Sequence, residues 1–147
     1  MEKRNQILEK IMKQLGGLHR HIATSRDTFL SQFELSRPQV DLLYCLHAGK
    51  KTTSELAKIF GVSSSAVSQM TDQLQLRKLV ERVPDASDKR VSYIQLSHHG
   101  TTTFCTIREK FMEHISTKFK GVTIEELQTL LTIITNVENE ITKGERT

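Results

Sequence analysis

Apolar residues recur at helical spacing near both ends of the chain. The first stripe has steps of three, four and seven: Ile7, Ile11, Leu15, Leu18, Ile22, Phe29 and Phe33. A second stripe comprises Phe104, Ile107, Phe111, Ile115 and Phe119, and a third comprises Leu127, Leu130, Ile134, Val137 and Ile141. The third has the four-three alternation of a coiled-coil seam. These patterns predict long helices at both ends, with a break at Gly121 before the capping box Thr123-x-x-Glu126.

Two shorter helices are predicted in the middle of the chain. One opens with the capping box Ser36-Arg37-Pro38-Gln39, carries Leu42, Leu43 and Leu46, and ends at Gly49. The other opens with Thr52, and Glu55 stands at the third helical position. Its apolar positions are Leu56, Ala57, Ile59 and Phe60. Gly61 is expected to end it, because glycine takes a left-handed conformation without steric cost.

A further helix is predicted directly after this glycine turn. Either Ser63 or Ser64 can cap it, and Val67, Met70 and Leu74 form its buried stripe. Two helices that cross closely need a small residue at their contact, and Ala57 supplies it. The apolar set Leu56, Phe60, Val62, Val67 and Met70 therefore predicts a helix-turn-helix over both segments.

A β-hairpin follows the second of these helices. Residues 79–83 and 91–96 are β-capable runs, with Ser92, Ile94 and Leu96 on one face. Pro84 ends the first strand, and Asp85-Ala86-Ser87-Asp88 has turn chemistry. The expected fold is thus mainly α with a small β-hairpin wing, a winged helix-turn-helix. Such a unit fits one helix into the DNA major groove and sets a charged loop beside it.

Polar residues stand where such a unit would contact DNA. At the start and along one side of the second helix they are Ser63, Ser64, Ser65, Ser68, Gln69 and Gln73. Serine and glutamine can hydrogen-bond base edges, although a solvated helix face with good caps has the same composition. In the hairpin loop the candidates are Lys89 and Arg90; an arginine there can enter a narrow minor groove. The alternative for the loop is an ordinary charged hairpin tip.

The chain resembles the multiple-antibiotic-resistance regulator (MarR) family of bacterial transcription factors over nearly its whole length. The resemblance is carried by the helix-turn-helix, Asp72 with Leu74, the run Leu79-Val80-Glu81-Arg82, the wing 85–90 and Leu96-Ser97-x-x-Gly100. The family's wing usually reads Asp-x-x-Asp-x-Arg, matched by Asp85, Asp88 and Arg90. The resemblance implies a homodimer on a pseudo-palindromic operator of double-stranded DNA, with Arg90 in the minor groove and Asp88 orienting it. Ser87 stands where some members carry arginine, so their additional phosphate contact is not expected.

The domain organisation follows from these elements. We expect a single MarR-like domain over residues 1–147, with the winged helix-turn-helix at 36–100 and dimerisation helices at 1–35 and 101–143. The three apolar stripes exceed what the winged unit can cover, and such surplus surfaces commonly mark interfaces. The alternative is an internal bundle in which the stripes pack only on one another.

Composition narrows the function further. The net charge of +4 and pI of about 9.2 suit an anionic partner. No apolar run reaches membrane-spanning length and no signal peptide opens the chain, so we expect no membrane association and a cytoplasmic location.

Cys45 and Cys105 are too few for a disulfide framework. The family's organic-hydroperoxide sensors keep a reactive cysteine near the start of their first helix, and this chain has none before Cys45.

Enzymatic and metal-binding signatures are not found in the sequence. It contains no phosphate-binding glycine loop, HExxH or CxxC pattern, and no Ser-His hydrolase motif. His98 and His99 are adjacent on a predicted helix and point in different directions, which disfavours chelation by both. Some relatives sense zinc through histidines and acids, but no matching ligand set is present here. We therefore expect no enzyme activity, no cofactor and no metal.

The resulting hypothesis is a dimeric, sequence-specific DNA-binding transcriptional regulator acting as a repressor. The family resemblance implies release by a small, often aromatic or anionic ligand that binds between the dimer helices and the DNA unit. The alternative is a winged-helix protein–protein interaction module without DNA affinity. Such a module would need neither the polar residues at the start of its second helix nor a basic wing.

Overall fold

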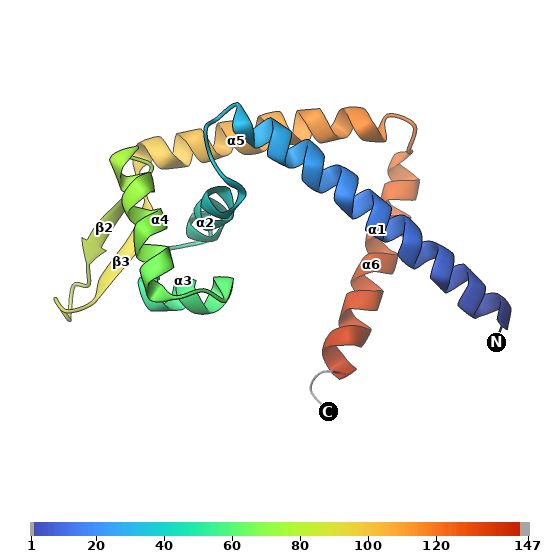
Figure 1. Ribbon diagram of the computed structural model, residues 1–147, viewed down its shortest axis with the longest axis horizontal. Coiled ribbons are helices and arrows are strands. Elements are labelled where there is room, and N and C mark those ends of the chain that lie inside the picture. The colour runs from blue at the N-terminus through green and yellow to red at the C-terminus, as the bar shows by residue number, and fades with distance from the viewer. Residues whose placement is uncertain (1, 145–147) are drawn as a thin grey trace. The chain divides into compact units, whose positions relative to one another are not determined.

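A computed structural model describes residues 2–144; Met1 and residues 145–147 of the expected domain lie outside them. The described residues form six α-helices, one 3₁₀ turn and one antiparallel sheet (Figure 1). In chain order the elements are α1 (Glu2–Ser31), α2 (Arg37–His47), β1 (Lys51–Thr52), α3 (Thr53–Phe60), α4 (Ser64–Leu76), β2 (Val80–Pro84), β3 (Ser92–Leu96), α5 (His98–Ser116), η1 (Thr117–Phe119) and α6 (Ile124–Gly144). The chain divides into two compact units, and the boundary between them lies within α5, after Phe111. The expected mainly helical winged helix-turn-helix is confirmed.

The hydrophobic core belongs to the first unit. Its fully buried side chains come from α2, α3, α4 and the sheet: Leu42, Leu43, Leu56, Val67, Leu74, Val80 and Ile94. Phe29 and Leu30 from the end of α1, and Phe104 and Ile107 from α5, complete it. Phe29 also contacts Phe33 and Phe111, with ring centroids 5.3 and 5.4 Å apart. The core therefore fixes the end of α1 and the first half of α5 against the winged unit.

Helix starts follow the predicted capping residues. Ser36 Oγ accepts a hydrogen bond from Gln39 N, and Ser36 N donates to Gln39 Oε1 at 2.9 Å. Thr52 and Glu55 make the same reciprocal pair, at 3.2 and 2.7 Å. Ser63 rather than Ser64 caps α4, accepting from Ala66 N at 3.1 Å. Gly61 ends α3 in the left-handed conformation, with φ of 63°, as its sequence position indicates.

The sheet has one strand that the sequence did not predict. Its strand order is β1-β3-β2, with Lys51 opposite Ile94 and Thr52 opposite Tyr93. The hairpin pairs β2 with β3 from Val80–Leu96 to Pro84–Ser92. A strand of two residues carries no alternation, so β1 is defined only by its pairing with β3. The expected hairpin is thus part of a three-stranded sheet.

Helix α4 ends in a Schellman motif centred on a lysine. Leu79 N donates to Leu74 O, and Lys78 N donates to Gln75 O, both at 2.9 Å. Lys78 has φ of 57°, the left-handed conformation that this motif requires and that glycine usually supplies. Leu74 and Leu79 are both buried and provide the apolar contact that accompanies the motif. The chain consequently turns sharply from α4 into β2.

The start of α5 packs directly onto this turn. Ser97 N donates to Leu79 O at 3.1 Å, and Ser97 Oγ donates to Lys78 O while accepting from Gly100 N. Gly100 is buried, and a Cβ added to it would lie 1.8 Å from Leu79 O. Only glycine permits the backbone of α5 to approach the end of α4 this closely.

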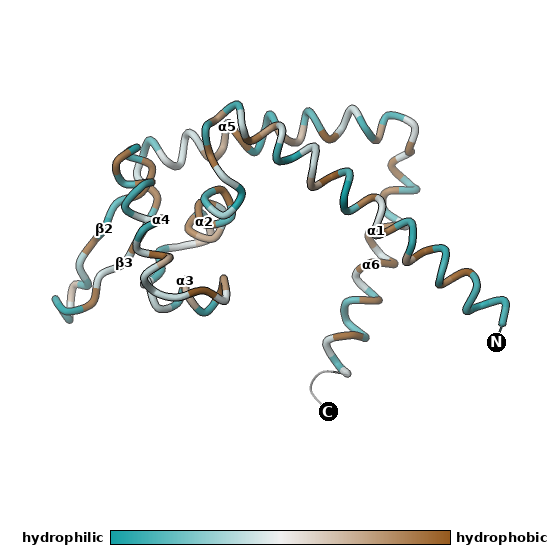
Figure 2. Tube along the Cα trace, viewed as in Figure 1, coloured by the Kyte–Doolittle hydropathy of each residue, from teal (hydrophilic) through white to brown (hydrophobic). Residues whose placement is uncertain are grey.

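The long terminal helices carry apolar faces without cover. In α1, Ile7, Ile11, Leu15 and Leu18 are exposed, whereas Ile22 is half-buried. In the second unit, no described residue of α6 is buried. Figure 2 shows hydrophobic positions alternating with hydrophilic ones along both helices. The stripes of α1 and α5 are buried where they reach the core of the first unit, at Phe29, Phe104 and Ile107. The first half of the α1 stripe and the stripe of α6 are exposed.

Two details of the predicted helix-turn-helix core are corrected by the structure. Val62 is exposed, at 43%, because it lies in the turn rather than at the crossing of the helices. Met70 is only half-buried, whereas the next residue, Thr71, is fully buried. A pattern of apolar residues cannot identify Thr71 as a core residue, because its side chain is polar. Its hydroxyl donates to Val67 O at 2.8 Å. A threonine whose hydroxyl is satisfied by its own helix can occupy a core position.

Replacing Gly100 with alanine tests the contact with Leu79. The new methyl group must displace backbone rather than a flexible side chain, so we expect a loss of about 3 kcal/mol or more in the free energy of unfolding. Chemical denaturation measures it. Gly121→Ala is the matched control, because nothing lies within 4 Å of its added Cβ. Equal stability of Gly100→Ala and wild type would contradict the close packing.

Candidate nucleic-acid interface

Helices α3 and α4 form the helix-turn-helix, and burial divides α4 into two sides. Val67, Thr71 and Leu74 face the core. Of the predicted contact residues, Ser63, Ser64, Ser65, Gln69 and Gln73 are exposed and Ser68 is half-buried. One structural element therefore brings all six predicted polar residues to the outer side of α4 or its N-terminus.

The polar side chains on α4 differ in what they bind. Within residues 2–144, the side chains of Ser64, Ser65, Ser68 and Gln69 make no hydrogen bond. Ser63 is engaged as the helix cap, and Gln73 Oε1 accepts from Gln39 Nε2 at 3.1 Å. The first half of α4 thus presents polar groups available to an external partner, whereas Gln73 already has a protein partner.

The wing loop is closed by hydrogen bonds from its own residues. Asp85 N donates to Val91 O, and Val91 N donates to Asp88 O, both at 2.9 Å. Asp85 Oδ1 accepts from Ser87 Oγ at 2.6 Å, Ser87 N at 2.8 Å and Asp88 N at 3.0 Å. These bonds, led by the Ser87 hydroxyl, lower the pKa of Asp85 to about 2. The carboxylate holds the loop in a single arrangement.

Asp88 contacts Arg90 at the end of this loop. Asp88 Oδ1 accepts from Arg90 N at 3.0 Å and from Arg90 Nε at 3.1 Å, and Oδ2 accepts from Nη2 at 3.3 Å. These bonds lower the pKa of Asp88. The Arg90 side chain is 92% exposed, and Lys89 is exposed beside it. The contact places the guanidinium beside the Asp88 carboxylate without burying it.

A cluster at the base of the wing was not predicted from the sequence. Lys50 Nζ lies 4.3 Å from the centroid of the Tyr93 ring, a cation–π geometry. The charge of Asp85 is the main cause that raises the pKa of Tyr93. Lys50 and Tyr93 are far apart in sequence, and the pairing of β1 with β3 brings them together. No local pattern could have identified this contact.

A salt bridge joins α4 to the wing. Arg82 Nη2 on β2 lies 3.0 Å from Asp72 Oδ1 on α4. The sequence pattern did not predict this contact, and both residues were notable only for their resemblance to the MarR family. The bridge connects the outer side of α4 to the first strand of the hairpin, in addition to the buried core that they share.

The remaining candidates do not gather into a site. Within residues 2–144, no group of three or more His, Cys, Asp or Glu residues could hold a metal ion. His98 and His99 are exposed at the start of α5, and Cys45 and Cys105 are free and half-buried. None of the described helices is long and apolar enough to cross a membrane.

An exposed polar side of α4 beside a wing that presents Lys89 and Arg90 defines the chain as a winged helix-turn-helix protein. The model of the MarR family matches residues 33–91, which include α2, the helix-turn-helix and the wing loop. The HTH-type transcriptional regulator YsmB of Bacillus subtilis is 31% identical over 99 residues, covering 67% of this chain and 68% of that protein. The chain belongs to the MarR family of HTH-type transcriptional regulators, which are not enzymes.

Solved structures agree with this fold. A MarR family protein from Bacillus stearothermophilus superposes with a TM-score of 0.83 at 20% identity, covering 94% of this chain and 97% of that chain. A point mutant of Staphylococcus aureus MepR, solved bound to an oligodeoxyribonucleotide, gives a TM-score of 0.66 at 22% identity, covering 89% of this chain and 97% of that chain. The expected winged fold therefore extends beyond the helix-turn-helix to most of the chain.

The Asp85 carboxylate should make the wing loop sensitive to acid. Its folded-state pKa of about 2 lies below the ordinary value of 3.8, so the unfolded chain binds more protons in this interval. The contribution of Asp85 to stability is therefore present above the ordinary value and is lost as the pH falls through about 2. The amide resonances of Ser87 and Asp88, followed by NMR during acidification, should report this loss. A midpoint at the ordinary value would contradict the hydrogen-bonded loop, and Asp85→Ala should abolish the transition.

Proposed function

We propose that this regulator is a homodimeric repressor that binds a pseudo-palindromic operator in double-stranded DNA. The observation that carries the proposal is the placement of polar side chains on the first half of α4 beside the oriented Arg90 of the wing. Both belong to the first unit, so their relative position is fixed by one core. A protein–protein module would have no need for this combination.

Each polar residue has a role that its chemistry permits. Ser64, Ser65, Ser68 and Gln69 read base edges in the major groove, where glutamine can pair with adenine in bidentate fashion. Ser63 holds the N-terminus of α4, whose free N–H groups favour a phosphate, and Gln73 lies further along the same side. Arg90 enters the minor groove, oriented by Asp88, and Lys89 contacts phosphate. The oligodeoxyribonucleotide bound to S. aureus MepR supports a DNA partner for this fold.

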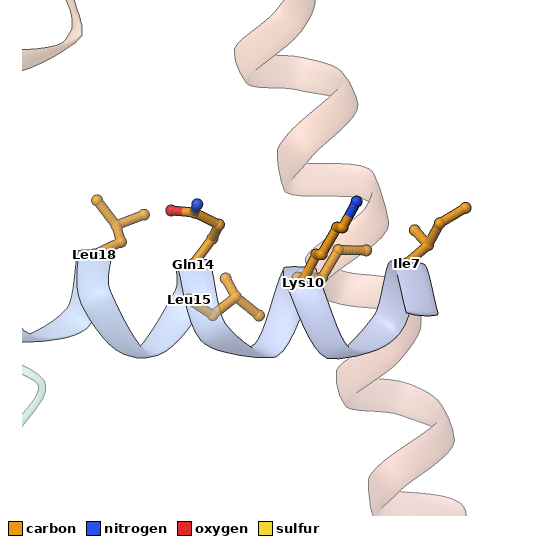
Figure 3. A pocket seen from close by; sticks show the side chains of 6 residues that line it. Ile7, Lys10, Gln14, Leu15 and Leu18 are labelled. Atoms are coloured by element: carbon orange, nitrogen blue, oxygen red, sulfur yellow. The ribbon is translucent and has the colours of Figure 1, made fainter. Parts of the chain in front are cut away.

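The exposed apolar faces support a homodimer. Figure 3 shows side chains of Ile7, Leu15 and Leu18 on α1, with Lys10 and Gln14 at the same open pocket. On α6, the exposed positions include Leu127, Leu130, Ile134, Val137 and Ile141. Isolated helices are marginal in water and need tertiary packing of their apolar face. A second copy supplies that cover, with residues 1–35 and 101–143 as the dimerisation regions and 36–100 as the DNA-binding unit.

Ligand control is the part of the proposal that the family resemblance supports. A small aromatic or anionic molecule would bind between the dimerisation helices and the winged unit and change the spacing of the two α4 helices. Release from the operator would follow, because both half-sites must be engaged together. A transcriptional repressor acts on the bacterial chromosome, so the proposed function implies a cytoplasmic location.

Replacing Arg90 with alanine tests the DNA-binding proposal. A duplex selected by the wild type from a random library should contain an imperfect inverted repeat, with half-sites about 10 base pairs apart. Arg90→Ala should bind this duplex much more weakly, and the slope of log affinity against log salt should fall by about two units per dimer. Its melting temperature should stay near that of wild type, because an exposed arginine contributes little to folding.

Arg108→Ala is the matched control for this experiment, because it removes an exposed arginine from α5. Asp88→Ala should weaken binding less than Arg90→Ala, since it frees the guanidinium without deleting its charge. Unchanged affinity of Arg90→Ala at every salt concentration would make the wing purely structural. Failure of the wild type to prefer any duplex would contradict sequence-specific binding altogether.

Charge introduced on the apolar face of α6 tests the dimer. The double variant Leu130→Glu, Ile134→Glu should be a monomer and should lose tight operator binding, because buried unpaired carboxylates oppose association. Sedimentation at micromolar concentration measures the mass. The control Gln128→Glu, Thr132→Glu has the same charge and spacing on the other side of α6 and should remain dimeric. A monomeric wild type would refute the proposed assembly.

A further inference from the structure

Arg77 connects the end of α4 to the end of α1. It is the C-cap residue of α4, and its side chain reaches the connection between α1 and α2. Arg77 Nη1 donates to Glu34 O at 2.6 Å, and Nη2 donates to Phe33 O at 2.9 Å. The two terminal nitrogens of one planar guanidinium thus contact two successive main-chain carbonyls, a geometry that lysine cannot reproduce.

The carbonyls that Arg77 contacts belong to the connection that follows α1, two and three residues after the helix ends at Ser31. This helix has 30 residues and no basic residue in its last turn. After Ser31 the chain continues in tight turns, with Phe33 N donating to Leu30 O and Glu34 N to Ser31 O. Glu34 then takes φ of 53°, in the left-handed region. A cation near the C-terminal end of a helix is favourable, and the Arg77 guanidinium lies just beyond that end of α1.

A second polar contact joins α4, one helical turn earlier, to the first turn of α2. Gln73 Oε1 on α4 accepts from Gln39 Nε2 at 3.1 Å. Gln39 is also the third helical residue of α2 and closes its capping box, with its Oε1 accepting from Ser36 N at 2.9 Å. Gln73 and Arg77 are four residues apart and share one side of α4. The second half of α4 is therefore attached at two points to residues 33–39.

We propose that Arg77 is a positioning residue that couples the end of α1 to the orientation of α4, and this inference rests on the proposed DNA-binding function. Movement of α1 in the dimer is passed to the recognition helix through the guanidinium–carbonyl contact. The contact acts at the end of α4 opposite to the serines that face DNA. A small tilt there displaces Ser64 and Ser65 relative to the base edges.

The competing interpretation is that Arg77, as a cation on the recognition helix, contacts a DNA phosphate. The two roles predict different binding data. A phosphate contact contributes equally to all duplexes and to the salt slope, and lysine can replace it. A positioning contact contributes mainly to the preferred duplex, leaves the salt slope unchanged, and is lost in Arg77→Lys.

The test compares Arg77→Lys and Arg77→Gln with Lys78→Gln. Lys78→Gln is the matched control, because it removes one exposed charge from the neighbouring residue. Affinities are measured for the duplex selected by wild type and for a scrambled duplex of equal length. Arg77→Lys and Arg77→Gln should each lower the ratio of the two affinities about tenfold, which is the size expected for charge-assisted hydrogen bonds. Lys78→Gln should leave it unchanged.

Amide hydrogen exchange without DNA supplies an independent measurement. Arg77→Gln should accelerate exchange in residues 32–36 and in the last turn of α4 severalfold, because the link between them is removed. Wild-type exchange there would overturn the coupling, whatever the DNA result. Equal weakening for both duplexes with a reduced salt slope, or full rescue by lysine, would make Arg77 a phosphate contact. If wild type prefers no duplex, the DNA-binding proposal fails, while the exchange data still decide the coupling.

Discussion

The close approach of α5 to the end of α4 is the constraint on which the winged unit depends. Leu79 lies between the end of α4 at Leu76 and the start of β2 at Val80, and its carbonyl accepts a hydrogen bond from Ser97 N. Gly100 is in van der Waals contact with the same peptide, so the start of α5 cannot shift without moving the end of α4. The left-handed Lys78 turns the chain at this point. One junction thus sets the direction of α4, the wing and α5 together.

Features encoded within a few residues of one another were predictable. The capping boxes at Ser36 and Thr52, the glycine stop at Gly61 and the turn after Pro84 all depend on local hydrogen bonds or backbone preferences. The same holds for the polar side of α4, because helical periodicity separates it from the Val67–Leu74 side. The sequence therefore predicted the helix-turn-helix, the wing loop and the candidate DNA-contact residues as a group.

Features that depend on distant partners were missed. Strand β1 is defined by pairing with β3, and the contact of Lys50 with Tyr93 follows from that pairing. Arg77 contacts carbonyls more than 40 residues earlier in the chain. Lys78 occupies a helix-ending position where glycine is usual, so its residue type did not indicate the end of α4. Every residue has a main-chain carbonyl, so a side chain that binds one has no partner residue type to be recognised in the sequence. Such contacts become visible only in the folded structure.

The acidic residues of the wing loop weaken its attraction to DNA but also supply hydrogen bonds that order the loop. Asp85 and Asp88 offset the charges of Lys89 and Arg90 in a loop proposed to meet DNA, which weakens its attraction to phosphate. Their hydrogen bonds, however, fix the loop and hold the Arg90 guanidinium before any partner arrives. Ordering a flexible arginine on binding costs conformational entropy, and the contact with Asp88 reduces that cost. In the proposed complex, this arrangement favours discrimination between groove shapes over general affinity for nucleic acid.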